Sequence, residues 1–528
     1  MLVSTTSRHR KLGLFGAAAL CLALPLSAGC SSSPAQSSGG GGAGGTTASG
    51  GTTSNGGTTS NGGTTSNGGT TSNGGTTESG GTTASGGGGT GGGGPNGPAL
   101  WARGYPDLWN PIVNDIAVDD AGNVYIAGVV EPHDENFGSG IEPCTSTLGC
   151  GFLIKLDTDG AEVWHRMFNV GQGHGVLVNS ISLTADGLLL GIHWKRGAIA
   201  MGPLDLGLGP IQPEGYSNLI VARFDLDGNP VWNQRYGTNA TANSGVYPTT
   251  ILSEGPKDFT VLGGFNLFGT DLGLGLMNAV GSGDTYFVAH FVDGAPVWQH
   301  AFNGSLYCQV SDLVKTPDGG YTMTGSLLDD MIGASFIPSA PGAEAPFMGH
   351  YDKDGNPVWG KTYQAAPSGA LEQSGAGDST GAVLMTGHGS GNIDTNGGPS
   401  LVLNQESSYL LKTNATGQTV LVKSADSFDI DLHSVVYADA DDNILWSGTI
   451  KVQDANMLYL KGRLTKLAPD GTVTWEILAD NFGPKAIASD SLGNVYTAGV
   501  YMHQLDIAPG IPPAPINYER AFIAKFAP

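Results

Sequence analysis

The chain has 528 residues, of which 86 are glycine and 13% are charged, and its 46 acidic and 23 basic residues give a formal net charge of −23. An acidic surface of this kind repels phosphate backbones and anionic lipid, which excludes nucleic acid as a partner. The glycine content and the lack of a long helical pattern predict an all-β chain with many turns and a low-complexity segment.

A basic head opens the chain, formed by Arg8, Arg10 and Lys11. An apolar stretch over 12–26 follows and is short for a transmembrane helix, so residues 1–29 have the pattern of an export signal. The stretch ends in LSAGC at Cys30, which resembles the lipobox of bacterial lipoproteins, although Ser27 stands where that pattern prefers leucine. The resemblance implies that Cys30 carries lipid such as palmitate. Because Ser31 rather than aspartate follows, it also implies an anchor in the outer membrane or at the cell surface; ordinary secretion is the alternative.

Residues 30–98 are almost entirely glycine, threonine, serine and asparagine, and the hexad GGTTSN or a near copy recurs from Gly44 to Ser85. Such a segment cannot bury apolar surface, so we expect it to be disordered. A flexible coil of this length has a root-mean-square span of about 45 Å. We therefore interpret it as a tether that leads to a folded domain over 99–528.

One stretch recurs through this domain, and its clearest copy runs from Phe152 to Phe168 as FLIKLDTDGAEVWHRMF. An alternating apolar run, a tight Asp-Gly turn and a second run with an aromatic slot are the signature of a β-hairpin. The slot is filled in successive copies by Trp164, Trp232, Trp298, Trp359, Leu421 and Trp475. A seventh copy is split between the chain ends: Phe522–Phe526 is its first arm, and Leu100–Tyr105, which contains Trp101, is its second.

A more variable hairpin precedes each of these seven, clearest over 114–128 and 486–499. Two hairpins per repeat predict a seven-bladed β-propeller of four-stranded blades, in which the N-terminal strand closes the last blade. The first strand of each blade then lines the axis. The residues of the slot, being on the outermost strand, are expected to fill the wedge between neighbouring blades.

The blade begins with DxxGNVYxAG and ends with KxDxxGxxVW, and in both features it resembles the bacterial SBBP-type propeller repeat over Leu100–Pro528. That resemblance implies a secreted seven-bladed propeller and leaves the role open. The tryptophan slots are also similar to those of quinoprotein dehydrogenases and of the lipoprotein that assists outer-membrane barrel assembly, which usually have eight blades.

The cysteines agree with export. Cys144 and Cys150 flank a short polar loop and are predicted to form a disulfide. Cys308 lies in an alternating run, and we expect a buried free thiol rather than a nucleophile.

The DxDG turns at Asp157, Asp225 and Asp352 carry alternating carboxylates, as calcium loops do. They lack the further acidic ligands of such loops, and Asp and Gly are what tight turns require. We therefore predict no cofactor and no metal, with calcium as the alternative.

Long connections between the second and third strands of each blade should emerge on one face, where binding groups collect in propellers. These connections are expected over 129–151, 193–217, 265–283, 326–346, 388–408, 449–458 and 500–520. The DLGLG turns at Asp205 and Asp271 repeat, so a shared structural role is favoured for them. The groups that do not repeat are the candidates for binding: His133, Asp134 and Glu135; His193, Trp194, Lys195 and Arg196; Asp329 and Asp330; His388; His503; and Tyr518, Glu519 and Arg520.

The sequence contains no GxSxG elbow, HExxH pair, P-loop or GxGxxG fingerprint. We therefore expect a monomeric, non-catalytic interaction module for a protein or glycan partner, in contact with the membrane through its lipid alone. The alternatives are an extracytoplasmic glycan lyase or hydrolase, a quinoprotein-like oxidoreductase, or an outer-membrane assembly scaffold, because propeller enzymes assemble their sites from separate blades.

Overall fold

The structure is a computed structural model that describes residues 99–528, apart from 139, 172, 198–201, 240–244, 267, 281–283, 367–369, 396, 426–432, 455–456, 509 and 516–517. The predicted signal peptide, the lipidation site at Cys30 and the tether lie outside the described residues. No helix occurs among the residues described.

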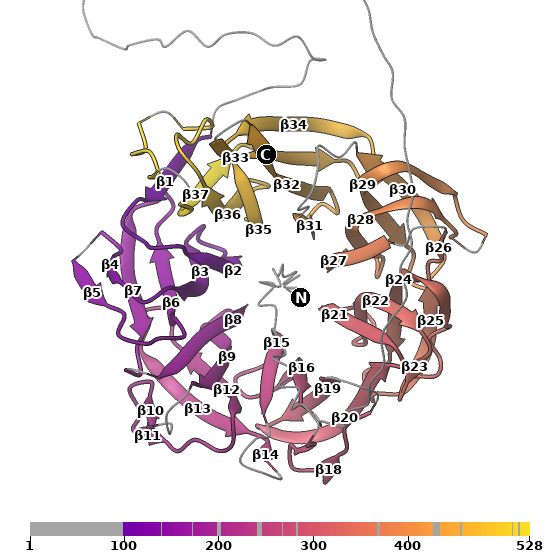
Figure 1. Ribbon diagram of the computed structural model, residues 1–528, viewed down its shortest axis with the longest axis horizontal. Coiled ribbons are helices and arrows are strands. Elements are labelled where there is room, and N and C mark those ends of the chain that lie inside the picture. The colour runs from indigo at the N-terminus through magenta and orange to yellow at the C-terminus, as the bar shows by residue number, and fades with distance from the viewer. Residues whose placement is uncertain are drawn as a thin grey trace, which may run out of the picture. The chain divides into compact units, whose positions relative to one another are not determined.

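Seven antiparallel sheets of four main strands stand around a common axis, which confirms the predicted propeller (Figure 1). Blade 1 contains β2 (Ile112–Val118), β3 (Val124–Val130), β6 (Cys150–Leu156) and β7 (Glu162–Phe168). Blade 2 contains β8 (His174–Thr184), β9 (Gly187–Arg196), β12 (Ser217–Phe224) and β13 (Pro230–Tyr236). Blade 3 contains β15 (Val246–Ser253), β16 (Phe259–Phe265), β19 (Thr285–Val292) and β20 (Ala295–Gly304).

Blade 4 contains β21 (Tyr307–Lys315), β22 (Tyr321–Asp329), β24 (Ala340–Tyr351) and β25 (Pro357–Thr362). Blade 5 contains β27 (Ala370–Gly377), β28 (Val383–Ile393), β29 (Leu401–Thr413) and β30 (Thr419–Ala425). Blade 6 contains β31 (His433–Ala438), β32 (Ile444–Asp454), β33 (Met457–Leu467) and β34 (Val473–Asp480). Blade 7 contains β35 (Gly483–Ser489), β36 (Val495–Tyr501), β37 (Arg520–Phe526) and β1 (Trp101–Tyr105). Short strands complete the set: β4 (Asp134–Asn136), β5 (Ile141–Pro143), β10 (Leu204–Asp205), β11 (Pro210–Ile211), β14 (Thr238–Asn239), β17 (Thr270–Asp271), β18 (Leu276–Met277), β23 (Met331–Ile332) and β26 (Ala365–Ala366).

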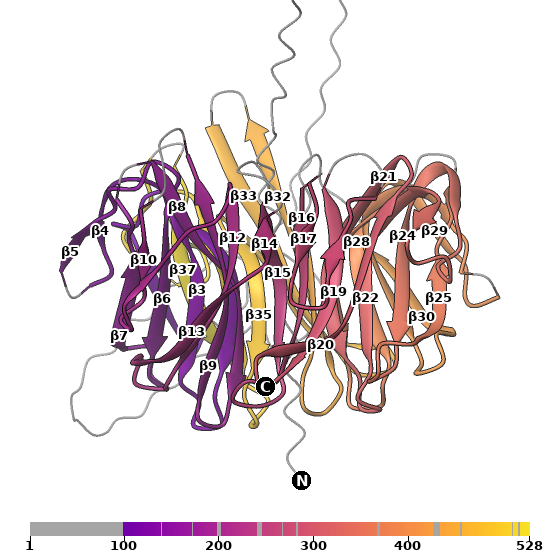
Figure 2. The ribbon, with the colours of Figure 1, turned by 90° about the horizontal axis from the view of Figure 1, so that it is seen from below.

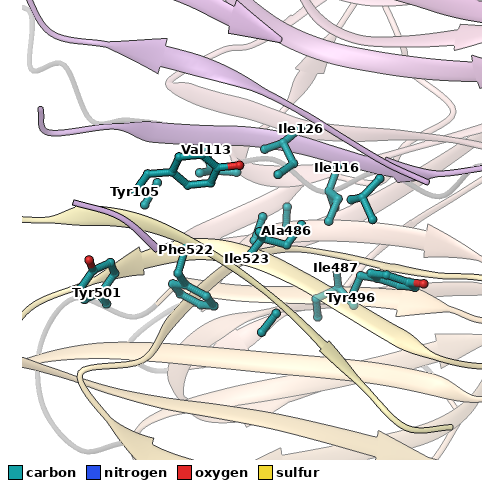
Figure 3. Close-up of a cluster of buried hydrophobic side chains, with 14 of the residues drawn as sticks. Tyr105, Val113, Ile116, Ile126, Ala486, Ile487, Tyr496, Tyr501, Phe522 and Ile523 are labelled. Carbon is teal, nitrogen blue, oxygen red and sulfur yellow. The ribbon is translucent and has the colours of Figure 1, made fainter. Parts of the chain in front are cut away.

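The ring is closed by β1, which pairs antiparallel with β37 so that Trp101 stands opposite Lys525. Behind this pairing, apolar side chains of blades 7 and 1 form one buried cluster that includes Ile116, Ile487 and Phe522 (Figure 3). The first described strand thus covers an edge that β37 would otherwise expose. Closure by the N-terminal strand is as predicted.

The two ends of the blades differ in what they carry. At the lower face lie the turns between first and second strands and between third and fourth strands. At the upper face lie the connections between second and third strands, called inserts below, and the links from one blade to the next. Figure 2 shows the ring from the side, with the C-terminus at the lower face and the hairpin of β32 and β33 rising at the upper face.

The Asp-Gly turns of the lower face are held by their own aspartate. In blade 1 the Asp157 Oδ1 accepts hydrogen bonds from the amides of Asp159 (3.0 Å) and Ala161 (2.8 Å), and Gly160 has φ +80°. Asp225 and Asp352 bind amides in the same way in blades 2 and 4. A carboxylate oxygen that accepts two amides fixes the turn, which is why Asp and Gly recur there.

The tryptophans of the slot join each blade to the next. The indole Nε1 of Trp164 donates to Leu226 O (3.2 Å) in the turn of blade 2, and Trp101 and Trp298 donate to the equivalent turns of blades 1 and 4. The turn glycine lies against the ring: a Cβ at Gly228 would come within 3.0 Å of Trp164. These rings therefore lie between blades, but apart from buried Trp475 they are half-buried at the surface rather than in the core.

The two cysteine predictions are confirmed. Cys144 and Cys150 form a disulfide, with their Cα atoms 5.8 Å apart. Cys308 is a buried free thiol, and burial raises its pKa to about 12. At neutral pH it is therefore protonated and a poor nucleophile.

The inserts of blades 2 and 3 carry the repeated DLGLG turn, for which the sequence favoured a shared structural role. In the DLGLG turn of blade 2, Asp205 Oδ1 accepts the amides of Gly207 and Gly209, and Leu206 is buried. A Cβ at Gly207 would lie 2.8 Å from Pro230, so this insert folds back onto the beginning of the outermost strand. The equivalent turn of blade 3 does the same, which identifies DLGLG as a structural cover for the blade.

The inserts of blades 4, 5 and 6 are also shorter than predicted, because the flanking strands continue through the expected loops. In blade 5, β28 extends to Ile393 and β29 begins at Leu401. Inserts close to the predicted length therefore occur in blades 1, 2, 3 and 7.

Candidate functional site

Five side chains meet at the upper face where blade 7 joins blade 1, and we call this group the seam site: Trp109, His133, Glu135, Tyr518 and Arg520. Trp109 lies in the link between β1 and β2. His133 and Glu135 lie in the insert of blade 1, and Tyr518 and Arg520 stand where the insert of blade 7 enters β37. Three segments distant in sequence thus contribute to one site.

Trp109 is the centre of the seam site. Its ring stacks on His133, with 4.7 Å between centroids and an interplanar angle of 10°, and Tyr518 lies 4.7 Å away at 44°. The Arg520 guanidinium carbon lies 4.8 Å from the Trp109 ring centroid, within cation–π range. His133 is exposed and Tyr518 is 39% exposed, so the aromatic group reaches the solvent.

Glu135 is fully buried beneath this aromatic group. Its Oε2 accepts a hydrogen bond from the Trp109 amide (2.8 Å), whereas its Oε1 has no hydrogen-bond partner in the described part of the chain. Burial raises the pKa of Glu135 to about 7, against the opposing influence of the Trp109 amide, His133 and Arg520. The side chain can therefore hold or release a proton near neutral pH.

Arg520 is 3% exposed and presents a second polar atom without a partner. Its Nη1 donates to Glu519 O (3.2 Å), while no hydrogen-bond acceptor faces its Nε among the residues described. Burial lowers the pKa of Arg520, although a guanidinium stays charged at physiological pH. A buried donor and a buried acceptor at one site are thus both without a hydrogen-bond partner among the described residues.

The backbone around the seam site is well constrained. Strands β4 and β5 pair through Asp134 and Pro143, and the Cys144 amide donates to His133 O (2.8 Å), next to the disulfide. The Glu131 amide donates to Trp109 O (3.3 Å), which attaches the insert to the link. The insert therefore holds His133 and Glu135 on a rigid support.

Arg520 departs from the repeat. The seven blades can be aligned on a glycine that recurs at one position of the second strand. In blade 7 this residue is Gly499, which pairs with Phe522, two residues after Arg520. The equivalent positions of blades 1 to 6 hold Cys150, Leu219, Thr285, Ala345, Ser407 and Lys461. Arginine at this position is particular to the seam.

The structure brings together four of the predicted residues, His133, Glu135, Tyr518 and Arg520, and adds Trp109, which sequence reasoning missed. A signal for Trp109 was present, because it is a tryptophan outside the repeated slot, in a link between blades. Asp134 lies beside the group in β4 and is exposed.

The predicted loop position of Trp194 is wrong. Trp194 is fully buried in β9, opposite Asn218 of β12, because β9 continues to Arg196. Lys195 and Arg196 belong to the same strand, and burial lowers the pKa of Lys195. Replacing Trp194 would therefore disturb the core of blade 2.

The remaining candidates lie elsewhere. His193 Nε2 is 2.9 Å from Ser217 Oγ, and its ring stacks on Tyr247 of blade 3 at 5.2 Å. His388 is in β28 opposite Ser408 rather than in a loop, because that strand continues past it. Asp329 is the last residue of β22 rather than part of a loop; it has φ 73° and accepts from Ser305 Oγ. The amide of Asp330 donates to the same hydroxyl, and His503 lies in the insert of blade 7.

In the described part of the chain, no three acidic, histidine or cysteine side chains are grouped as metal ligands would be. The same part contains no helix that is long and apolar enough to cross a membrane. What the seam site offers is a hydrogen-bond acceptor, a donor and an aromatic wall in one place.

No protein-family model matches the chain, and no curated protein sequence matches it. Among solved structures it is similar to prolyl oligopeptidase B from Galerina marginata, with 9% identity and a TM-score of 0.34, covering 75% of this chain and 45% of that one. It is also similar to a Trypanosoma rangeli sialidase mutant, with 9% identity and a TM-score of 0.31, covering 79% of this chain and 54% of that one. The WD40 domain of SCAP from fission yeast has 8% identity and a TM-score of 0.28, covering 81% of this chain and 94% of that one. The chain thus spans about half the length of the first two proteins, and likenesses at this level carry no functional argument.

Proposed function

We propose that this protein is a lipid-anchored extracytoplasmic module whose propeller binds a partner in the cell envelope through the seam site, without chemistry. The observation that carries the proposal is the pair of buried polar atoms, on Glu135 and Arg520, that no group in the described chain satisfies. A site that leaves such atoms open in the absence of a partner gains their hydrogen bonds when a partner supplies them.

The end of the ring at which the described chain begins supports this function. The Leu100 amide bonds to Lys525 O at the lower face, and β1 runs from there to the upper face, where Trp109 follows. The described chain thus enters the ring at the face opposite to the seam site. The lipobox-like sequence at Cys30 and the low-complexity segment supply the anchor and the reach.

The binding proposal is tested by photo-crosslinking in cells. A photoreactive phenylalanine analogue is placed at Tyr518 in the full chain, and at Leu492 of the lower face, which is 78% exposed, as a matched control. We expect a discrete adduct with an envelope component from position 518 and none from position 492. Adducts of equal yield from both positions, or from 492 alone, would reject the upper face as the binding surface.

The anchor has a separate test. Radiolabelled palmitate should enter the wild-type chain and fail to enter Cys30→Ala. Cleavage at another position without lipid, seen by intact mass, would contradict the anchor and leave the binding proposal untouched.

A further inference from the structure

We propose that the ligand of the seam site is a neutral glycan, and that one sugar hydroxyl bridges Glu135 Oε1 and Arg520 Nε. This inference rests on the proposed function, since it assumes that the upper face binds a partner, and it names the chemical class of that partner. Both bridged atoms are buried and lack partners among the described residues.

A hydroxyl group satisfies both atoms at once. It donates its proton to the carboxylate oxygen of Glu135 and accepts the Nε proton of Arg520. A ligand carboxylate would accept from Arg520 but would face Glu135 as a like charge whenever Glu135 is ionised, and a ligand ammonium would be repelled by the Arg520 guanidinium. An uncharged group that is both donor and acceptor is therefore the best match.

The charges around the seam site favour a neutral ligand over an acidic one. Asp107, Glu131 and Asp134 are exposed on the segments that surround it. Asp107 also accepts from Asn136 Nδ2 (3.2 Å), which keeps its carboxylate at the edge of the site. A uronate-rich polymer would meet this acidic rim and the net charge of −23.

The aromatic wall suits the other surface of a sugar. A pyranose ring presents hydroxyls at its edge and C–H groups on its faces, so it can direct an edge to Glu135 and Arg520 while a face packs on an aromatic ring. Tyr518 is the ring available for this contact, because it is 39% exposed and lies 4.7 Å from Trp109. A few oriented polar groups beside aromatic side chains are typical of small-molecule sites.

The test uses the mature full-length protein and a printed panel of neutral hexose and N-acetylhexosamine oligosaccharides, with oligogalacturonates as the acidic arm. We expect binding to a neutral oligosaccharide that falls at least about tenfold in Arg520→Gln and in Glu135→Leu, because each removes one of the two bridging hydrogen bonds. Lys461→Gln is the matched control, since Lys461 occupies the same register position in blade 6, and it should bind as the wild type does. Tyr518→Ala should weaken binding with the melting temperature unchanged, which separates the site from a folding defect.

Three results would overturn the inference and leave the proposed function standing. The first is a preference for oligogalacturonates. The second is neutral-sugar binding that Arg520→Gln, Glu135→Leu and Tyr518→Ala all leave unchanged. The third is no binding to any oligosaccharide while position 518 still crosslinks to an envelope protein. If no adduct forms at 518 either, the proposed function fails together with it.

Discussion

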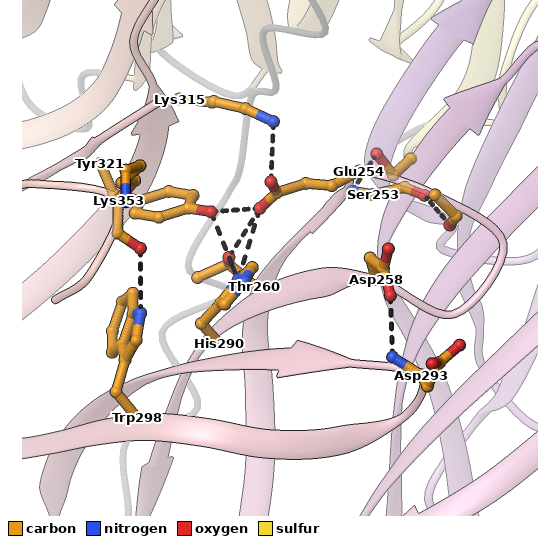
Figure 4. A network of polar contacts seen from close by, with 12 residues as sticks. Ser253, Glu254, Asp258, Thr260, His290, Asp293, Trp298, Lys315, Tyr321 and Lys353 are labelled. Carbon is orange, nitrogen blue, oxygen red and sulfur yellow. Dashed lines mark hydrogen bonds and ion pairs between the residues drawn. The ribbon is translucent and has the colours of Figure 1, made fainter. Parts of the chain in front are cut away.

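Two carboxylates of this propeller have opposite surroundings: Glu254 lies between blades 3 and 4 with its side chain 17% exposed, whereas Glu135 is buried at the seam. Glu254 accepts hydrogen bonds from Lys315 Nζ (2.8 Å), Thr260 Oγ1 (3.0 Å) and Tyr321 Oη, and His290 lies beside it (Figure 4). Glu135 accepts one amide hydrogen bond, and its Oε1 has no partner among the described residues. Glu254 connects two blades, whereas Glu135 keeps one oxygen without a hydrogen-bond partner among the described residues.

The pKa values follow this difference. Burial alone would raise the pKa of Glu254, but the hydrogen bonds from Lys315 and Tyr321 outweigh it and the pKa is lowered. At Glu135 burial dominates and the pKa is raised to about 7. A buried carboxylate is stabilised as an anion only where donors replace the water that it loses.

The largest expected effect comes from removing the closure of the ring. Deleting residues 99–105 takes away β1 and the Trp101 contact to blade 1, and exposes the edge of β37. We expect a loss of more than about 5 kcal/mol in the free energy of unfolding, measured by chemical denaturation. Deleting residues 50–56 of the tether is the matched control. An unchanged denaturation midpoint after the first deletion would contradict the closure.

A smaller effect is expected from Glu135→Gln, and its sign depends on pH. The folded-state pKa of Glu135, about 7, lies above the ordinary value of 4.5. Ionisation of Glu135 therefore lowers the free energy of unfolding progressively as pH rises from about 4.5 to about 7. The variant lacks this penalty, so at pH 8 it should be more stable than the wild type by about 2 to 3 kcal/mol and near equal to it at pH 4.

Glu254→Gln is the counterpart of that variant. The pKa of Glu254 lies below its ordinary value, so its contribution to stability is present above pH 4.5 and is lost as pH falls through the lowered folded-state pKa. The variant should lose about 1 to 2 kcal/mol at pH 7. Shifts of the same sign for both variants at pH 7 to 8 would refute the comparison.

Trp298→Ala tests the contact between blades 3 and 4. The ring is half-buried, its Nε1 donates to Lys353 O, and Gly355 lies against it. We expect a loss of about 2 kcal/mol, below the range for a fully buried aromatic. Trp298→Phe keeps most of the packing and should lose about half as much, as followed by thermal unfolding.

The smallest effect is a gain in blade 5, where Leu421 replaces the tryptophan. The turn of blade 6 already has the features that contact a tryptophan in other blades. A Cβ at Gly471 would lie 2.7 Å from Leu421, and Pro469 O occupies the position of the carbonyl that accepts from the indole Nε1 elsewhere. Leu421→Trp should add about 0.5 to 1 kcal/mol through one hydrogen bond and more buried ring. A loss of stability would show that the ring does not fit this interface.

The sequence by itself determined the seven blades, the closing strand and the disulfide. Each of these depends on local signals that recur, such as alternation of apolar residues, Asp-Gly turns and a short spacing between cysteines. It misplaced Trp194 and His388, because polar residues continue both strands beyond their apolar runs and backbone pairing with β12 and β29 decides where the strands end.

Only the tertiary structure decided the seam site. Closing the ring brings the link that carries Trp109 against the insert of blade 7, which ends next to Arg520 at the far end of the chain. The burial of Glu135 between them, with no partner for its Oε1 in the described part of the chain, depends on how three separate segments pack, and no periodic pattern encodes this packing. Repetition made the scaffold predictable, while the site lies where the repeat is interrupted because the ring must close.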